Sequence, residues 1–212
     1  MGKLRARTEE EIHQRYQDIL NSAKQLFLIM EYEDISLAIV AKELNITRPS
    51  LYNYFDSKEA LFLELCKEEY LKLSEELLKE FQQPRELPDF CDKLFDVLMS
   101  NNLFVKLMSL HQTVMETKAG QDAMENFKTD TLPFFQALEK VVSIQFPDAS
   151  KAQQVLFVMQ INILMNTVYA YISTPKEQQE VMKRIGTFGA SDIPSAKEFY
   201  TETLMSLAKA LL

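Results

Sequence analysis

Side chains suited to binding DNA gather in one short segment of the chain. Arg48 can bind guanine and Asn53 can bind adenine, each through paired hydrogen bonds in the major groove. Lys58 lies where a following helix is expected to begin, and the free amide groups of a helix start favour an anion such as phosphate. Hydroxyl groups suited to phosphate or thymine-methyl contacts lie between them, on Ser50, Tyr52 and Tyr54. The competing interpretation is that the tyrosines belong to the core and that Arg48 is a solvated charge.

Two short helices joined by a tight turn are expected to position this segment. Ser36 can cap the first helix and Thr47 the second, because a hydroxyl at the N-cap accepts a hydrogen bond from a free amide. Asn45 falls in the turn, where a left-handed backbone is needed. Leu51 and Phe55 are four residues apart and should face the core together with Ile46. The side left for DNA then carries Arg48, Pro49, Ser50, Tyr52, Asn53 and Tyr54.

Longer helices are expected on both sides of this unit. Apolar residues recur at helical spacing from Ile12 to Met30, and Asp56 or Ser57 can cap a fourth helix running to about Phe81. Pro133 should kink or split one of the later helices. The later helices are expected near 89–100, 103–117, 121–145, 150–173, 176–185 and 195–211. The predicted fold is therefore all-α.

The region between about positions 10 and 62 resembles the TetR family of bacterial transcriptional regulators. The runs Ala23–Phe27, Ile39–Thr47 and Leu51–Leu61 carry the resemblance, and Leu-Tyr-x-Tyr-Phe-x-Ser-Lys-Glu-x-Leu is its most distinctive part. Two departures are Glu31 and Asn45, where members of the family often have glycine. The resemblance implies an N-terminal three-helix helix-turn-helix head in residues 1–56, joined by a long helix to a ligand-binding and dimerisation bundle in residues 57–212. It implies phosphate contacts at Thr47, Tyr52, Tyr54 and Lys58; Ser36 is added to the expected DNA-facing residues.

A sensing pocket is expected in the bundle, on helices rich in methionine and phenylalanine. The amides of Asn162 and Asn166 and the phenol of Tyr169 recur along one side of an otherwise apolar segment, and buried amides without partners cost about 1–3 kcal/mol each. Another helix, a dimer partner, water or a ligand must therefore satisfy them. The expected apolar lining is Phe104, Leu107, Met108, Met115 and Phe134, with His111 as a polar contact. The competing interpretation is that each of these residues belongs to an ordinary core.

The last two long helices carry more apolar surface than a small protein's core needs. In the TetR family, the equivalent helices form a four-helix bundle between two subunits. The residues expected at this dimer interface are Leu156, Ile163, Phe199, Leu204, Leu207 and Leu211. The apolar run from Val155 to Ile172 is long enough to span a membrane, but Gln160, Asn162 and Asn166 interrupt it. We interpret the run as a deeply buried helix of a cytoplasmic protein with no membrane partner.

Charge and composition exclude several kinds of site. The net charge is −8, and residues 1–60 contain 8 Lys and Arg against 10 Asp and Glu, a balance of −2. DNA binding must therefore depend on where the cations lie, including Lys3, Arg5 and Arg7 in a candidate basic arm. Cys66 and Cys91 match no metal or redox motif, so no metal or cofactor is expected. No nucleophile elbow or phosphate-binding loop is found, so catalysis is not expected.

These patterns predict a sequence-specific DNA-binding transcriptional regulator. We expect a repressor that a small apolar or amphipathic ligand releases from a palindromic operator. The first alternative is a dimeric DNA-binding regulator with no small-molecule effector. A second alternative, a helical enzyme or lipid carrier, would need neither Arg48 nor Lys58.

Overall fold

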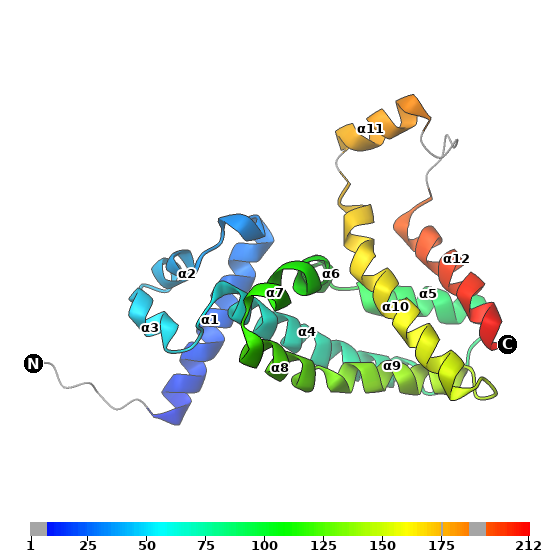
Figure 1. The fold of residues 1–212 in the computed structure, drawn as a ribbon, viewed down its shortest axis with the longest axis horizontal. Helices are drawn as coiled ribbons and strands as arrows, with labels where there is room; N and C mark the ends of the chain where they lie inside the picture. The colour runs from blue at the N-terminus through cyan, green and yellow to red at the C-terminus, as the bar shows by residue number, and fades with distance from the viewer. Residues whose placement is uncertain (1–7, 175, 187–193) are drawn as a thin grey trace, which may run out of the picture. The chain divides into compact units, whose positions relative to one another are not determined.

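The computed structural model describes residues 8–174, 176–186 and 194–212, leaving out the side chains of Tyr169 and Lys176. Regular structure in these residues is helical, as the sequence predicts (Figure 1). The chain forms two compact units: unit 1 is Met1–Glu68 with His111–Thr129, and unit 2 is Glu69–Leu110 with Asp130–Leu212. Residues 57–68 and 111–129 therefore group with the N-terminal helices, whereas the functional division at position 56 stays a prediction.

Unit 1 begins with three helices whose first turns are capped by side chains, and the third ends at Tyr52, before the Phe55 that was expected to continue it. Thr8 and Glu11 form a capping box at the start of the first helix, where each side chain pairs with the other residue's backbone amide. Asn45 adopts φ 51° in the turn between the second and third helices, as predicted. The helices are α1 (Glu9–Ile29), α2 (Leu37–Glu43) and α3 (Arg48–Tyr52), with a 3₁₀ turn at Tyr32–Asp34 between α1 and α2.

Aromatic rings form much of the core of unit 1. The Tyr32 ring packs edge-on against Phe62 and Phe27, with centroids 5.0 and 6.3 Å apart. Tyr16 stacks on Phe55 at 5.2 Å. These contacts join α1 and the 3₁₀ turn to the start of α4 (Lys58–Glu80), which Ser57 caps through a 3.0 Å hydrogen bond from the Ala60 amide.

The later helices follow the predicted order with two local changes. The expected helix over 121–145 is split at Thr131, because Pro133 lies in the first turn of a new helix that begins at Leu132. The expected helix over 103–117 contains a π-helical turn at His111–Met115. The helices are α5 (Leu87–Met99), α6 (Asn102–Leu110), α7 (Glu116–Lys118), α8 (Gln121–Asp130), α9 (Leu132–Gln145), α10 (Lys151–Ile172), α11 (Lys176–Ile185) and α12 (Ala196–Ala208).

Unit 2 is organised around α10, which packs against α6, α9 and α12, while α12 also packs against α5. Tyr70 is buried between Phe104 and Phe134, with ring centroids 5.2 and 4.7 Å away. Burial raises the pKa of the Cys91 thiol to about 12. Cys91 therefore stays protonated near neutral pH, which argues against a redox role.

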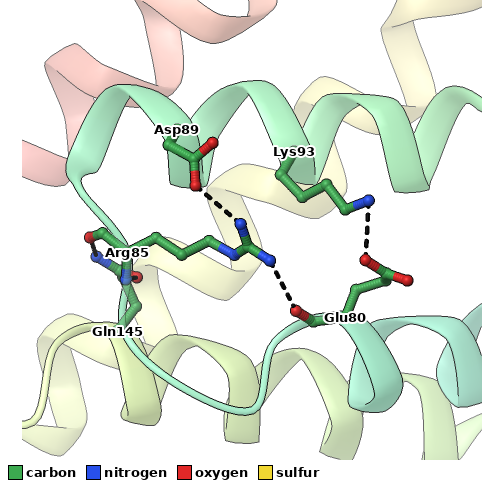
Figure 2. Close-up of polar contacts among 5 residues, drawn as sticks. All are labelled: Glu80, Arg85, Asp89, Lys93 and Gln145. Atoms are coloured by element: carbon green, nitrogen blue, oxygen red, sulfur yellow. Dashed lines mark hydrogen bonds and ion pairs between the residues drawn. The ribbon is translucent and has the colours of Figure 1, made fainter.

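A cluster of polar side chains holds the segment that connects α4 to α5 (Figure 2). Gln145 accepts a hydrogen bond from the Arg85 amide at 2.9 Å and donates one to the Arg85 carbonyl at 2.8 Å. The Arg85 guanidinium pairs with Asp89 and donates to the Glu80 carbonyl at the end of α4. Lys93 pairs with the Glu80 carboxylate at 2.8 Å. The cluster thus satisfies a free helix-end carbonyl and ties α9 to this connection.

The prediction that the apolar run from Val155 to Ile172 is deeply buried is wrong for the single chain. Among the described residues, α10 alone is long and apolar enough to cross a membrane, by length and composition only, and 29% of its most apolar window is buried. One side of α10 packs against the other helices of unit 2. The opposite side exposes Leu156, Met159 and Ile163. Sequence hydrophobicity alone does not distinguish a helix buried on all sides from one that leaves an apolar side exposed.

Candidate functional site

The third helix presents a polar face to solvent. Leu51 is fully buried and Phe55 is 4% exposed, so both belong to the core as predicted. Tyr52 is 52% exposed, which excludes the alternative in which it is a core aromatic. Tyr54 is half-buried. The exposed side chains of this segment are Thr47, Arg48, Pro49, Tyr52 and Asn53, with Ser50 partly exposed.

Local hydrogen bonds hold this face in place. The Thr47 hydroxyl accepts from the Ser50 amide at 3.3 Å, and the Ser36 hydroxyl accepts from the Ile39 amide at 3.3 Å. Both residues are exposed caps at the starts of α3 and α2. The two helices are therefore anchored at their first turns, and Arg48 projects from the first residue of α3.

Lys58 is engaged inside unit 1. Its ammonium group donates a 2.8 Å hydrogen bond to the Tyr32 carbonyl and lies 3.9 Å from the centroid of the Tyr32 ring. The sequence carries no sign of this pairing, because the two residues are 26 positions apart. The candidate basic arm of Lys3, Arg5 and Arg7 lies outside the described residues.

The predicted pocket residues divide between the two units. Unit 2 holds Phe104, Leu107 and Met108 on α6, Phe134 on α9 and the two asparagines on α10. The four apolar side chains are buried. The Oδ1 atoms of Asn162 and Asn166 are also buried, and neither has a hydrogen-bond partner among the described residues. The side chain of Tyr169 lies outside the described residues.

The other two predicted pocket residues, His111 and Met115, belong to the π-helical turn in unit 1. His111 is 2% exposed, and its Nε2 lies 3.6 Å from a carboxylate oxygen of Glu116, which also pairs with Lys128 at 2.6 Å. Met115 contacts the Cys66 thiol at 3.9 Å between sulfur atoms. The sequence analysis predicted none of these contacts, and the one between Met115 and Cys66 joins segments 49 residues apart.

The predicted dimer residues do not all share one surface. Leu156 and Ile163 on α10 and Phe199 on α12 are exposed. Leu204 is fully buried in the core of unit 2, so its assignment to an interface is corrected. Leu211 is 7% exposed. The reason is the helical period, which turns Leu204 toward the same side as the buried Tyr200 and Ala208. A hollow of about 170 Å³ is lined by Gln153, Leu156, Gln160, Ser206, Leu207, Ala210 and Leu211.

Two family profiles match this chain, one over the N-terminal helices and one over most of the helices that follow. The family profile described as "Bacterial regulatory proteins, tetR family" matches residues 19–65, and the one described as "Tetracyclin repressor-like, C-terminal domain" matches residues 67–193. The "Uncharacterized HTH-type transcriptional regulator YdgC" of Bacillus subtilis (strain 168) is 37% identical over 65 residues, which are 29% of this chain and 33% of that protein. The match thus spans about a third of the length of this curated relative.

Two solved structures share the fold over nearly the whole chain. A TetR transcriptional regulator from Rhodococcus sp. RHA1 aligns with a TM-score of 0.57 and 16% identity, covering 94% of this chain and 97% of that one. The fatty acid degradation regulator FadR from Bacillus halodurans aligns with a TM-score of 0.55 and 10% identity, covering 90% and 97%. At these identities the likeness concerns the fold alone.

Proposed function

The chain belongs to the TetR family of DNA-binding transcriptional regulators, and we propose that it acts in the cytoplasm as a homodimeric repressor of a palindromic operator. The polar face of α3 carries the DNA-binding part of this proposal. Arg48 and Asn53 are exposed there, while Leu51 anchors the same helix in the core. Arg48 reads guanine, Asn53 reads adenine, and the exposed hydroxyl groups hold the backbone.

Selection of DNA by the purified protein tests this reading. A random-sequence duplex library should yield one inverted repeat, because a two-fold symmetric dimer places two identical recognition helices on the DNA. The half-sites should lie about 34–36 Å apart, or somewhat further. Recovery of no preferred sequence would contradict sequence-specific binding, and recovery of single half-sites would contradict the dimer.

The exposed apolar side of α10 supports the homodimer. Leu156, Met159 and Ile163 are each more than half exposed, and large side chains of this kind in a contiguous row mark an interface. The hollow beside this row is also lined by the amide of Gln160. A lipid chain offers that amide no hydrogen bond, whereas a protein partner does. This favours a second subunit over a membrane.

The unpaired amide oxygens in unit 2 support a response to a small molecule. Asn162 and Asn166 lie on α10, which packs against the buried apolar residues of α6 and α9. Burying an amide oxygen without a partner costs about 1–3 kcal/mol, so a ligand donor is one way to recover that free energy. We propose a small amphipathic effector with an apolar body and an N–H or O–H donor. The alternative, a dimeric regulator without an effector, leaves these amides to water or to the partner subunit.

Thermal shift measurements separate the two alternatives. A library of amphipathic alcohols, amines and amides is screened against the wild-type protein and against Asn162→Leu. A true effector raises the unfolding midpoint of the wild type, because it binds only the folded state, and has less effect on the variant. The effector should also bind more weakly when the selected operator duplex is present, by the factor by which it weakens DNA binding. Equal affinity in both titrations would contradict the repressor switch.

A further inference from the structure

We propose that Tyr16 is a positioning residue for DNA binding, which links the end of the helix-turn-helix segment to α4 and so fixes the direction of α3. The inference rests on the proposed role of α3 as the recognition helix and on the proposed dimer. Tyr16 lies on α1, and its place in the sequence predicts only a side chain on the apolar face of that helix. Its two contacts give it a more specific role.

The ring of Tyr16 holds the residue that anchors the end of the helix-turn-helix segment. It stacks on the ring of Phe55, with centroids 5.2 Å apart and an angle of 27° between the ring planes. Phe55 is 4% exposed, and its amide donates a 3.2 Å hydrogen bond to the carbonyl of Leu51 in α3. Because α3 spans only Arg48–Tyr52, its direction depends on such anchors more than on its own few hydrogen bonds.

The hydroxyl group of Tyr16 reaches α4. It donates a 2.5 Å hydrogen bond to a carboxylate oxygen of Glu64, which lies 48 positions later in the chain. The same carboxylate oxygen pairs with the ammonium group of Lys67, almost one turn further along α4. Tyr16 and Glu64 are both half-buried, so little water competes for the hydrogen bond, and a carboxylate is a stronger acceptor than a neutral group.

Tyr16 therefore joins two parts of the chain that meet at a bend. Phe55 follows α3, Glu64 lies in the second turn of α4, and the bend at Asp56 and Ser57 separates them. The ring is fixed on one side of this bend and the hydroxyl group on the other. Turning α3 about the bend must break one of the two contacts, so Tyr16 holds α3 at one angle to α4.

This angle matters most when both recognition helices of a dimer bind the same duplex. Two identical helices must then reach half-sites at one fixed separation. A single subunit on a single half-site can reorient as a whole, whereas two linked subunits cannot both do so. Loss of the Tyr16 contacts should therefore weaken binding to a full palindromic operator and leave binding to one half-site unchanged. Loss of a direct DNA contact would weaken both.

The test measures the affinity of Tyr16→Phe for two duplexes selected with the wild-type protein, the full operator and a shorter duplex that contains one half-site. We expect the variant to bind the operator several-fold more weakly than the wild type and the half-site equally well. Tyr200→Phe is the matched control, because it removes a buried hydroxyl group that has no hydrogen-bond partner among the described residues. It should leave both affinities unchanged. Equal losses on the two duplexes, or a loss on neither, would overturn the proposal.

A double-mutant comparison in the DNA-free protein tests the link itself. Tyr16→Phe and Glu64→Ala should each lower the unfolding midpoint by about 2–4 °C, the size of one lost interaction in a chain of this length. The double variant should lose less than the sum, because both changes break the same hydrogen bond. Glu76→Ala, at an exposed position of the same helix, should instead be additive with Tyr16→Phe. Additive effects of Tyr16→Phe and Glu64→Ala would overturn the link.

Tyr16→Leu separates the ring from the hydroxyl group. It removes the stacking partner of Phe55 as well, so it should weaken binding to the full operator further than Tyr16→Phe does. Binding is measured far below the unfolding midpoint of each variant, so that a loss of folded protein does not lower the affinity. Equal affinities of the two variants would overturn the role of the ring. A wild-type protein that gains no affinity from the second half-site would contradict the proposed dimer, whereas the unfolding measurements judge the link without DNA.

Discussion

At the scale of single residues, Arg48 combines the features of a base-reading side chain. It is exposed, it starts α3, and its helix is anchored by the buried Leu51 three positions later. The Thr47 cap fixes the first turn from which Arg48 projects. A side chain held at a helix start in this way leads into the major groove in helix-turn-helix proteins.

We therefore predict that Arg48→Ala costs about 1–3 kcal/mol of binding free energy at one base pair and relaxes the preference there. Fluorescence anisotropy with the selected operator and its single-base variants measures this cost. Lys42→Ala, an exposed cation on α2, is the control and should leave the base preference intact. If Arg48→Ala kept the wild-type preference at every position, α3 would not be the recognition helix.

The Glu80–Lys93 pair makes a prediction about pH (Figure 2). The hydrogen bond and the charge of Lys93 lower the pKa of the Glu80 carboxyl below its ordinary value of 4.5. The folded state therefore favours the ionised carboxylate, so the pair stabilises the fold above pH 4.5 and loses this effect as the pH falls through the lowered pKa. We expect Glu80→Gln to reduce the free energy of unfolding at pH 7 but not at acidic pH.

Urea unfolding at a series of pH values from 7 downward measures this difference. Glu75→Gln is the matched control, since Glu75 is exposed on the same helix. At pH 7, Glu75→Gln should reduce the free energy of unfolding less than Glu80→Gln does. Because Glu80 is near the surface, high salt should also reduce the effect of Glu80→Gln. An effect of Glu80→Gln that persisted unchanged at low pH would show that the side chain acts through packing.

At the scale of elements, the turn between α2 and α3 sets the direction of α3, the proposed recognition helix. Asn45 adopts φ 51°, a left-handed conformation that asparagine accepts better than most residues and glycine accepts freely. The Ile46 amide then reaches back to the Ala41 carbonyl at 2.9 Å, which closes the end of α2. The turn is therefore set by its own sequence.

We predict that Asn45→Ala lowers the free energy of unfolding by about 1 kcal/mol, because a β-carbon without a compensating polar group is strained at positive φ. Asn45→Gly is the matched comparison and should be less destabilising or even stabilising. Chemical denaturation followed by circular dichroism measures both. Equal losses in the two variants would mean that the asparagine side chain, and not the backbone conformation, matters at this position.

At the scale of the whole molecule, the exposed side of α10 is the surface through which we propose that the dimer forms. Ile163 is 60% exposed and Leu156 is 55% exposed, on the side of the helix opposite its packing against unit 2. A soluble protein that leaves such a row uncovered tends to associate through it. Leu204 is already buried in the single chain, so a charge there would disturb folding before it disturbed assembly.

We predict that Ile163→Glu converts a dimer into a folded monomer, because a carboxylate would be buried against the partner without a counter-charge. Sedimentation velocity at micromolar concentration measures the change. Ile12→Glu, at an exposed apolar position of α1, is the control and should stay dimeric. A wild-type monomer, or a dimeric Ile163→Glu variant, would contradict an interface through α10. The monomer should also bind a single half-site weakly.

The sequence by itself determined the local features of this protein. Hydroxyl caps at Ser36 and Thr47, the left-handed Asn45 and the break near Pro133 all depend on hydrogen bonds and backbone sterics within a few residues. Such interactions can be predicted from the residues that make them. The motif ending at Leu61 likewise indicated the family, and the buried Leu51 and Phe55 followed from helical spacing.

Only the tertiary structure decided which surface each helix covers. Periodicity places Leu156 and Leu204 on apolar faces, but the neighbouring helices leave the first exposed and bury the second. The engagement of Lys58 depends on a carbonyl and a ring 26 residues away. His111 likewise belongs to unit 1 because the segment His111–Thr129 groups with Met1–Glu68, from which it is far in the sequence. Spacing along a helix shows which of its faces are apolar. Which apolar face is buried depends on the other helices that pack against it, and these are far away in the sequence.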